Sequence, residues 1–121
     1  MNKFYKSLLA AVLLIAAPLA VACDYPQRPA IPEGSTASKE EMIAASRAVK
    51  TFQADLVSYR ECLDAESAAK LAELEIGEAD QEEVDNHKEA ATKKYNASVD
   101  EEELIVAQFN QSVQAYKAQS N

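Results

Sequence analysis

The sequence predicts an all-α protein: an antiparallel two-helix hairpin of coiled-coil type, with an extended, proline-rich N-terminal segment folded back along it. Apolar residues recur at alternating steps of three and four along two long stretches, which is the period of packed helices. Capping and loop signals separate these stretches. Two glycines, no tryptophan and many Ala, Glu, Lys and Leu residues also favour helix over sheet.

Residues 1–22 have the composition of a signal peptide. Lys3 and Lys6 form a basic start, residues 8–17 are an apolar run, and residues 20–22 give the small-x-small pattern that signal peptidase recognises. A membrane-spanning helix needs roughly 20 apolar residues, so this run is too short for a stable anchor. The sequence therefore predicts export to the periplasm or beyond the cell.

The mature chain is acidic. Removing residues 1–22 removes two of the 12 basic residues and none of the 20 acidic ones, so the net charge becomes 10 − 20 = −10. Nucleic acids and anionic membranes bind clustered Lys and Arg. We therefore expect no nucleic acid among its partners, and no membrane unless the chain is lipidated at Cys23. We attribute the acidity to solubility.

The two cysteines of the mature chain, Cys23 and Cys62, allow two interpretations. An even count in an oxidising compartment predicts one disulfide bond, which accounts for both residues. Alternatively, residues 19–23 have the form of a lipoprotein signal in which Cys23 is acylated, and Asp24 would then influence membrane sorting. Ala20 stands where that signal prefers leucine, and acylation would leave Cys62 unpaired. The disulfide is the preferred interpretation.

Residues 23–37 form the proline-rich segment, in which every third residue from 26 to 32 is proline, as in a polyproline-II strand. Its length limits where a disulfide can form. Cys62 lies ~36 Å along the first predicted helix from Ser38, and the 15 steps from Cys23 to Ser38 span at most ~50 Å. The disulfide therefore requires this segment to fold back along the helix.

The first helix is predicted over residues 38–75. Ser38 is its N-cap and Glu41 completes a capping box. Gly77 stands where the C′ residue that follows a helix, usually a glycine in the left-handed conformation, is expected. The predicted apolar seam comprises Met42, Ala45, Val49, Phe52, Leu56, Tyr59 and Leu63.

The second helix is predicted over residues 81–118, after a loop at 76–79, with Asp80 as N-cap and Glu83 as its capping-box partner. Residues 38–121 thus form the hairpin, of two helices each ~55 Å long. One continuous helix is the alternative, because a glycine costs only about 1 kcal/mol in a helix. The predicted second seam comprises Val84, Ala91, Tyr95, Val99, Val106, Phe109, Val113 and Tyr116.

The length of these seams bears on function. Antiparallel packing places Phe109 and Tyr116 near Met42, and Tyr95 near Leu63. Most of the seam is expected to be core. The alternative is that two helices cannot bury it all, and that part serves as a partner groove or a dimer interface. The expected partner is therefore another protein or a second copy of the chain.

No catalytic or metal-binding set is predicted. His87 is the single histidine, with Glu83 and Asp80 one and two turns back, and we expect it to be solvated on an acidic face. The acidic clusters 78–85 and 100–103 lack the spacing of a calcium loop, and carboxylates in a helix point around the cylinder. No metal site and no cofactor are therefore expected.

Other enzyme signals are also missing. The chain has no Gly-x-Ser-x-Gly elbow and no glycine-rich phosphate loop. Cys62 and His87 make a formal nucleophile pair, but a disulfide-bonded cysteine is structural. The glycosylation triplets at 96–98 and 110–112 are treated as coincidence in a bacterial signal context. We expect a protein that is not an enzyme.

Short motifs lie at the start, middle and end of the mature chain: Cys23-x-x-Pro26, Ile31-Pro32-Glu33-Gly34, Ser38 to Met42, Cys62-Leu63, Phe109-Asn110 and Tyr116-Lys117. With these motifs the chain resembles a group of small exported proteobacterial proteins of unknown function. The resemblance implies an envelope protein and supplies no activity. The expected function is that of an exported, non-enzymatic helical interaction or structural protein, with an envelope lipoprotein acylated at Cys23 as the alternative.

Overall fold

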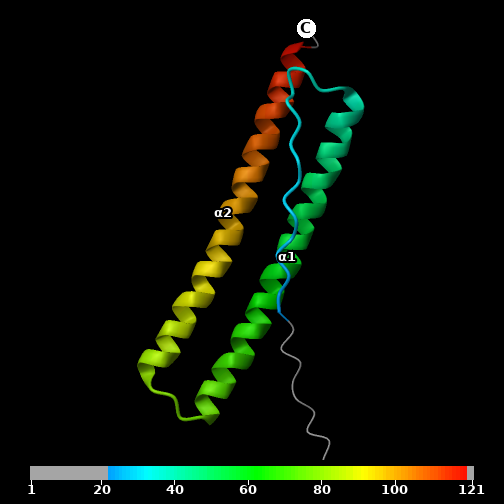
Figure 1. Cartoon of the computed structure of the whole chain (residues 1–121). Coiled ribbons are helices and arrows are strands. Elements are labelled where there is room, and N and C mark those ends of the chain that lie inside the picture. The colour runs from blue at the N-terminus through cyan, green and yellow to red at the C-terminus, as the bar shows by residue number, and fades with distance from the viewer. Residues whose placement is uncertain (1–21, 120–121) are drawn as a thin grey trace, which may run out of the picture.

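A computed structural model describes residues 22–119 of the chain. It contains α1 (Lys39–Ile76) and α2 (Gln81–Gln119), which pack against each other as an antiparallel hairpin (Figure 1). The predicted fold class is confirmed, and the predicted helix bounds differ by one residue at most. One continuous helix was the wrong alternative. The predicted signal peptide, residues 1–22, lies outside the described residues except for Ala22.

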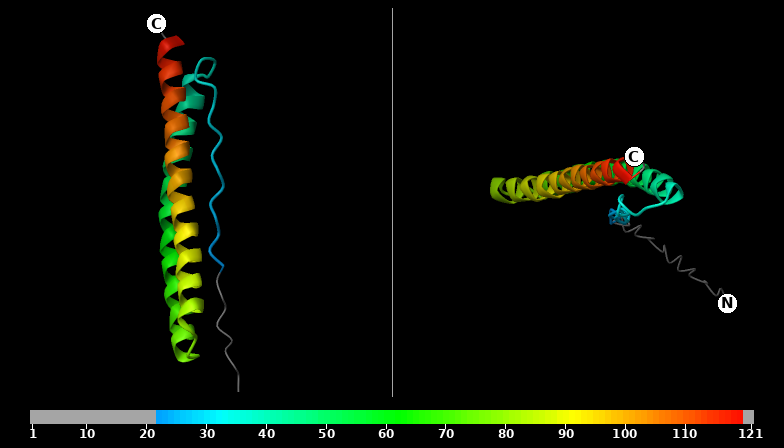
Figure 2. Two further views of the ribbon diagram at one scale, coloured as in Figure 1. Left: turned by 90° about the vertical axis from the view of Figure 1, so that its left-hand side faces the viewer. Right: turned by 90° about the horizontal axis from the view of Figure 1, so that it is seen from above.

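The extended segment runs back along the hairpin, as predicted. We call residues 23–37 the strap. Both views in Figure 2 show the two helices as one layer and the strap on one side of it. Neither helix is sufficiently long and apolar to cross a membrane, among the residues that the structure describes.

A capping box begins α1. The Glu41 N–H donates to Ser38 Oγ (3.2 Å), and the Ser38 N–H donates to the Glu41 carboxylate (2.7 Å). These bonds satisfy two of the backbone groups that a helix N-terminus leaves unpaired. They also lower the pKa of the Glu41 carboxyl, because the bonds from Ser38 favour its charged form.

The end of α1 differs from the prediction. Gly77 has φ −77°, and the left-handed conformation falls on Glu78 instead (φ 54°). The Glu78 and Ala79 N–H groups donate to the carbonyls of Glu75 (3.2 Å) and Leu74 (2.9 Å). This is a Schellman motif in which the residue after glycine occupies the strained position. Gly77 therefore predicts where α1 ends, but the positive φ is adopted by the residue that follows it.

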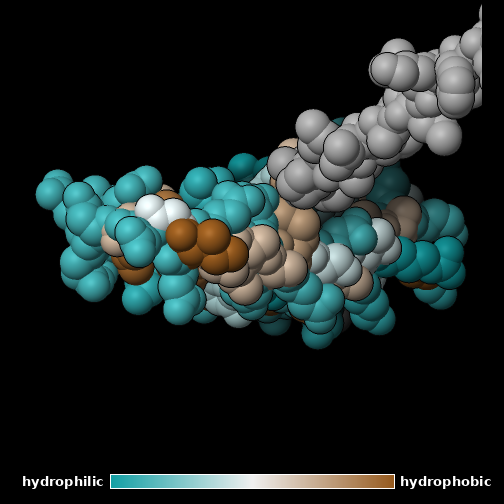
Figure 3. All heavy atoms as spheres, turned by 90° about the horizontal axis from the view of Figure 1, so that it is seen from below, coloured by the Kyte–Doolittle hydropathy of each residue, from teal (hydrophilic) through white to brown (hydrophobic). Residues whose placement is uncertain are grey.

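The loop leads directly into α2. Asp80 is its N-cap, since the Glu83 N–H donates to Asp80 Oδ1 (2.9 Å). This confirms the predicted cap. Figure 3 shows the molecule from this end: its visible surface is largely hydrophilic, with hydrophobic atoms gathered in small areas. Ile76, the last residue of α1, is one of the exposed large hydrophobic residues.

The apolar seam predicted for α1 is confirmed with one exception. Six of its seven residues are buried, and Tyr59 is only partly buried. Phe52 and Leu56, with Val49 and Ile105 of α2, form the central core cluster, against which Ile31 of the strap packs. The strap thus contributes a third layer to the core.

The seam predicted for α2 is wrong by about one position. The residues buried in α2 are Ser98, Ile105 and Ser112, seven apart, and the prediction contained none of them. The predicted residues Val99 and Val106 adjoin this stripe and are only partly buried. Two of the buried residues are serines, so the hydrophobic period favoured the more apolar neighbouring stripe.

Candidate functional site

The strap begins at a disulfide bond. Cys23 and Cys62 are joined, with Cα atoms 5.7 Å apart, which confirms the predicted pairing. Two residues further on, the Tyr25 ring packs edge-on against Tyr59 with centroids 5.0 Å apart. Burial raises the pKa of Tyr25, and the nearby Glu101 carboxylate raises it further. Tyr59 is therefore less buried than the other residues of its seam because it packs against the strap.

The other end of the strap is held by hydrogen bonds from α2. Ser112 Oγ donates to the Pro32 carbonyl (2.7 Å), and Gln119 Nε2 donates to the carbonyls of Gly34 (2.7 Å) and Ala37 (2.9 Å). Gly34 lies directly against the backbone of α2, where an added Cβ would overlap the carbonyl of Ser112. Only glycine at position 34 allows the strap to approach α2 this closely.

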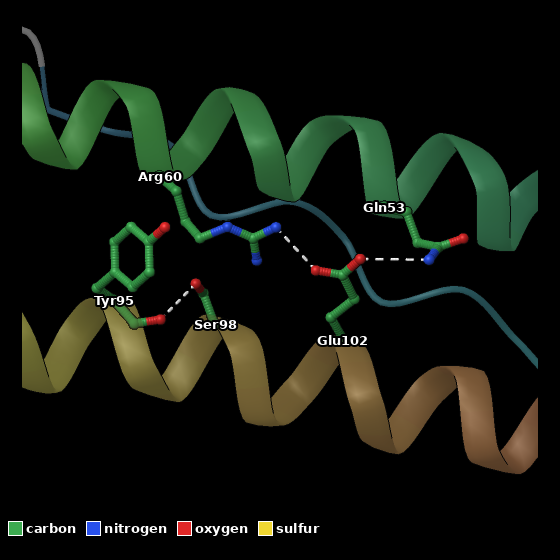
Figure 4. A network of polar contacts seen from close by, with 5 residues as sticks. All are labelled: Gln53, Arg60, Tyr95, Ser98 and Glu102. Carbon is green, nitrogen blue, oxygen red and sulfur yellow. Dashed lines mark hydrogen bonds and ion pairs between the residues drawn. The ribbon is translucent and has the colours of Figure 1, made fainter.

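A polar layer crosses the middle of the hairpin (Figure 4). Arg60 Nη2 donates to Glu102 at 2.8 Å, and Gln53 Nε2 donates to the other carboxylate oxygen at 3.2 Å. The Arg60 guanidinium also lies 5.9 Å from the ring centroid of Tyr95, and Ser98 Oγ donates to the Tyr95 carbonyl (2.6 Å). The Arg60 and Glu102 side chains are only 13% and 23% exposed.

The strap and the polar layer lie on opposite sides of the helix pair. Arg28 of the strap forms an ion pair with Glu101 (Nε–Oε1 3.1 Å), while the next residue, Glu102, binds Arg60. Similarly, Tyr59 packs against Tyr25 of the strap, while the next residue, Arg60, reaches across to Glu102. In Figure 4 the strap passes behind the labelled side chains. We call the two sides the strap face and the open face.

The polar layer is suited to specifying structure. Arg60 and Glu102 are largely removed from water, so misaligning the helices would leave both charges unpaired at a cost of several kcal/mol. One such pair therefore fixes the register of an otherwise repetitive interface. Arg60 Nη1 is buried without a hydrogen-bond partner among the described residues.

The histidine departs from expectation. His87 Nε2 lies 3.1 Å from Ser67 Oγ of α1, and its side chain is partly buried instead of solvated on an acidic face. No group of three His, Cys, Asp or Glu side chains could hold a metal ion within residues 22–119. In the acidic cluster 100–103, Glu101 and Glu102 are used in ion pairs.

The open face has a shallow depression toward the loop end. Leu63, Asp64 and Ser67 of α1 line it together with Ala91 and Tyr95 of α2. The predicted proximity of Tyr95 to Leu63 is thus confirmed. Met42 lies beside Ser112 at the other end (Sδ–Oγ 3.6 Å), as the antiparallel register requires.

Comparison with protein-family models, curated proteins and solved structures found no match to this chain. The sequence reasoning had identified the disulfide and the strap. It had not identified Arg60, Gln53 or Gly34. Glu102 falls between Val99 and Val106 on the apolar stripe predicted for the second helix. An acidic residue on such a stripe is a signal that points to a buried ion pair.

Proposed function

We propose that this chain is an exported, non-enzymatic protein of the cell envelope that acts as a helical interaction or structural module. The observation that carries the proposal is the bond between Cys23 and Cys62, which holds the strap on the hairpin. Disulfides of this kind persist in oxidising compartments and are rare in the cytosol. The predicted signal sequence points to the same location.

The side chains of the hairpin support a role in interaction. The charged groups nearest the helix interface, Arg60 and Glu102, neutralise each other and serve packing. Apolar side chains remain exposed away from the strap, with Val57 48% and Ile43 43% exposed on α1. Exposed apolar residues on a helix that already has a core are suited to a further protein contact.

The alternative, an envelope lipoprotein acylated at Cys23, requires the same sulfur atom that the disulfide uses. Intact mass of the protein purified from its native envelope, with and without reduction and alkylation, distinguishes the two. A chain beginning at Cys23 that accepts two alkyl groups only after reduction would support the proposal. A mass raised by acyl chains, with Cys62 alkylated without reduction, would replace it with the lipoprotein.

A further inference from the structure

A stripe of five residues runs along the open face of α1. Its members are seven residues apart, nearly two helical turns, so they lie on one side of the helix. They alternate between apolar and charged side chains, and four of the five are exposed. In order they are Ile43, Lys50, Val57, Asp64 and Leu71.

Contacts of neighbouring residues locate this stripe. Val57 lies between Gln53 and Arg60 on the helix surface, and both of these reach Glu102 on the open face. Asp64 lines the open-face depression. The strap covers the other side of α1, where Tyr59 packs against Tyr25. The strap therefore does not cover Val57, whose side chain is 48% exposed.

The charges of the stripe are arranged symmetrically about Val57. Lys50 stands seven residues before it and Asp64 seven residues after it, so these two charges exchange places when the stripe is reversed about Val57. The stripe therefore reads apolar, basic, apolar, acidic, apolar. In a second helix that runs antiparallel, Asp64 lies opposite Lys50 and Lys50 lies opposite Asp64, so each charged position meets the opposite charge. Such a surface is complementary to itself when two copies pack antiparallel.

We propose that the partner of this surface is a second copy of the chain. The two α1 helices pack antiparallel across a two-fold axis at Val57, which meets its counterpart. Lys50 pairs with the partner's Asp64, and Ile43 packs on the partner's Leu71. This proposal rests on the proposed function, an interaction module, and names its partner.

Charge favours a second copy over a basic partner protein. Two mature chains of net charge −10 repel each other at long range. On the stripe itself, however, Arg47 and Lys50 balance Glu61 and Asp64, so this part of α1 is neutral. A partner of opposite net charge would be opposed by the two basic residues. Only a partner with an acid opposite Lys50 and a base opposite Asp64 satisfies both of these charges, and an antiparallel second copy has that order.

The first test is sedimentation equilibrium of the purified, disulfide-bonded protein. We expect a dimer in the wild type. Val57→Glu places two like charges opposite each other on the axis, and should weaken the dimer by more than about 100-fold in Kd. Leu104→Glu is the matched control. Leu104 is 45% exposed and lies one turn from Glu101 on the strap face, so this variant should dimerise normally.

A charge exchange gives a sharper test. Lys50→Asp and Asp64→Lys should each abolish the dimer, because each creates two like-charged pairs. The double variant K50D/D64K should restore it. An equimolar mixture of the two single variants should form a heterodimer, because every pair in it is then opposite in charge.

A monomeric wild type at several hundred micromolar would overturn the dimer, as would Val57→Glu dimerising like the wild type. Failure of the mixed variants to associate would overturn the antiparallel register. Circular dichroism of each variant, compared with the Leu104→Glu protein, shows whether it is folded. None of these results bears on export, which the intact-mass experiment tests separately.

Discussion

The half of the hairpin beneath the strap and the half beyond Cys62 are built differently. The strapped half contains the central core, Val49, Phe52, Leu56 and Ile105, together with the polar layer. Toward the loop, buried residues of α1 are reduced to Leu63 and Leu74. Within the described chain, residues 81–97 of α2 contain no buried residue.

This difference shows what a third layer contributes. Two helices meet along one narrow line, and side chains beside that line stay partly in water. The strap closes one side of that line, so Leu56 and Ile105 become fully buried there. Beyond Cys62, the bond between His87 and Ser67 replaces apolar core. Stability should therefore be concentrated in the strapped half.

The largest expected effect follows from opening the disulfide. Cys62→Ser releases a loop closed over 39 residues of sequence separation. In the chain-entropy model this costs about 4 kcal/mol. Thermal melting should show the loss while circular dichroism still reports two helices. Hydrogen exchange should rise in the strapped half first. A melting temperature equal to that of the wild type would mean that the strap is held without its covalent bond.

Truncation of the core compares the two halves directly. Phe52→Ala removes a buried ring from the central cluster and should cost about 3 kcal/mol. Leu74→Ala, in the unstrapped half, should cost about 2 kcal/mol at most, because its neighbours are more exposed. Urea denaturation measures both. If both variants lose the same free energy of unfolding, the core beneath the strap is no more stabilising than the rest of the hairpin.

The close contact between the strap and α2 can be tested by adding one methyl group at Gly34. Gly34→Ala forces a methyl group onto the Ser112 carbonyl and should cost about 2 kcal/mol by displacing the strap. Gly77→Ala is the control, since φ there is −77° and a Cβ would meet its nearest atom at 3.3 Å. If both alanines destabilise the protein equally, the strap does not lie this close to α2.

The hairpin loop offers a small gain in stability. Glu78 has φ 54°, a conformation that costs a non-glycine residue roughly 1 kcal/mol. Glu78→Gly removes that strain but gives the unfolded chain more freedom, so we expect a gain of about 0.5 kcal/mol. Denaturant unfolding measures it. A loss of stability would place the positive φ at another residue.

The smallest effect concerns pH. The pKa of Tyr25 is raised above 10.0, first by burial and then by Glu101, so the folded protein favours the neutral phenol. The stability that this adds is present below pH 10 and is lost as the pH rises through the raised pKa. Titration of tyrosinate absorbance, with Tyr25→Phe as reference, should show one late-titrating group. A normal pKa for Tyr25 would indicate a detached strap.

Sequence alone predicted the hairpin, the N-caps of both helices and the disulfide, because these depend on local period and spacing. It misassigned the buried stripe of α2 because Ser112 is buried only where the strap approaches, through a bond to Pro32 that spans 80 residues. It also missed the partners of Glu102, because Arg60 and Gln53 lie on the other helix and only the packing of the two helices brings them to this carboxylate. Contacts that depend on tertiary approach leave no periodic signal.

The disulfide also determines how the chain responds to a protease. A single cut anywhere between Cys23 and Cys62 leaves two fragments joined through sulfur, and they can remain associated as before. A single cut after Cys62 leaves two pieces that no covalent bond joins. The loop at 77–80 is the non-helical part of that region within residues 22–119. Proteases prefer such exposed loops, so nicking at this loop is the cleavage that would release α2 from the covalently closed remainder.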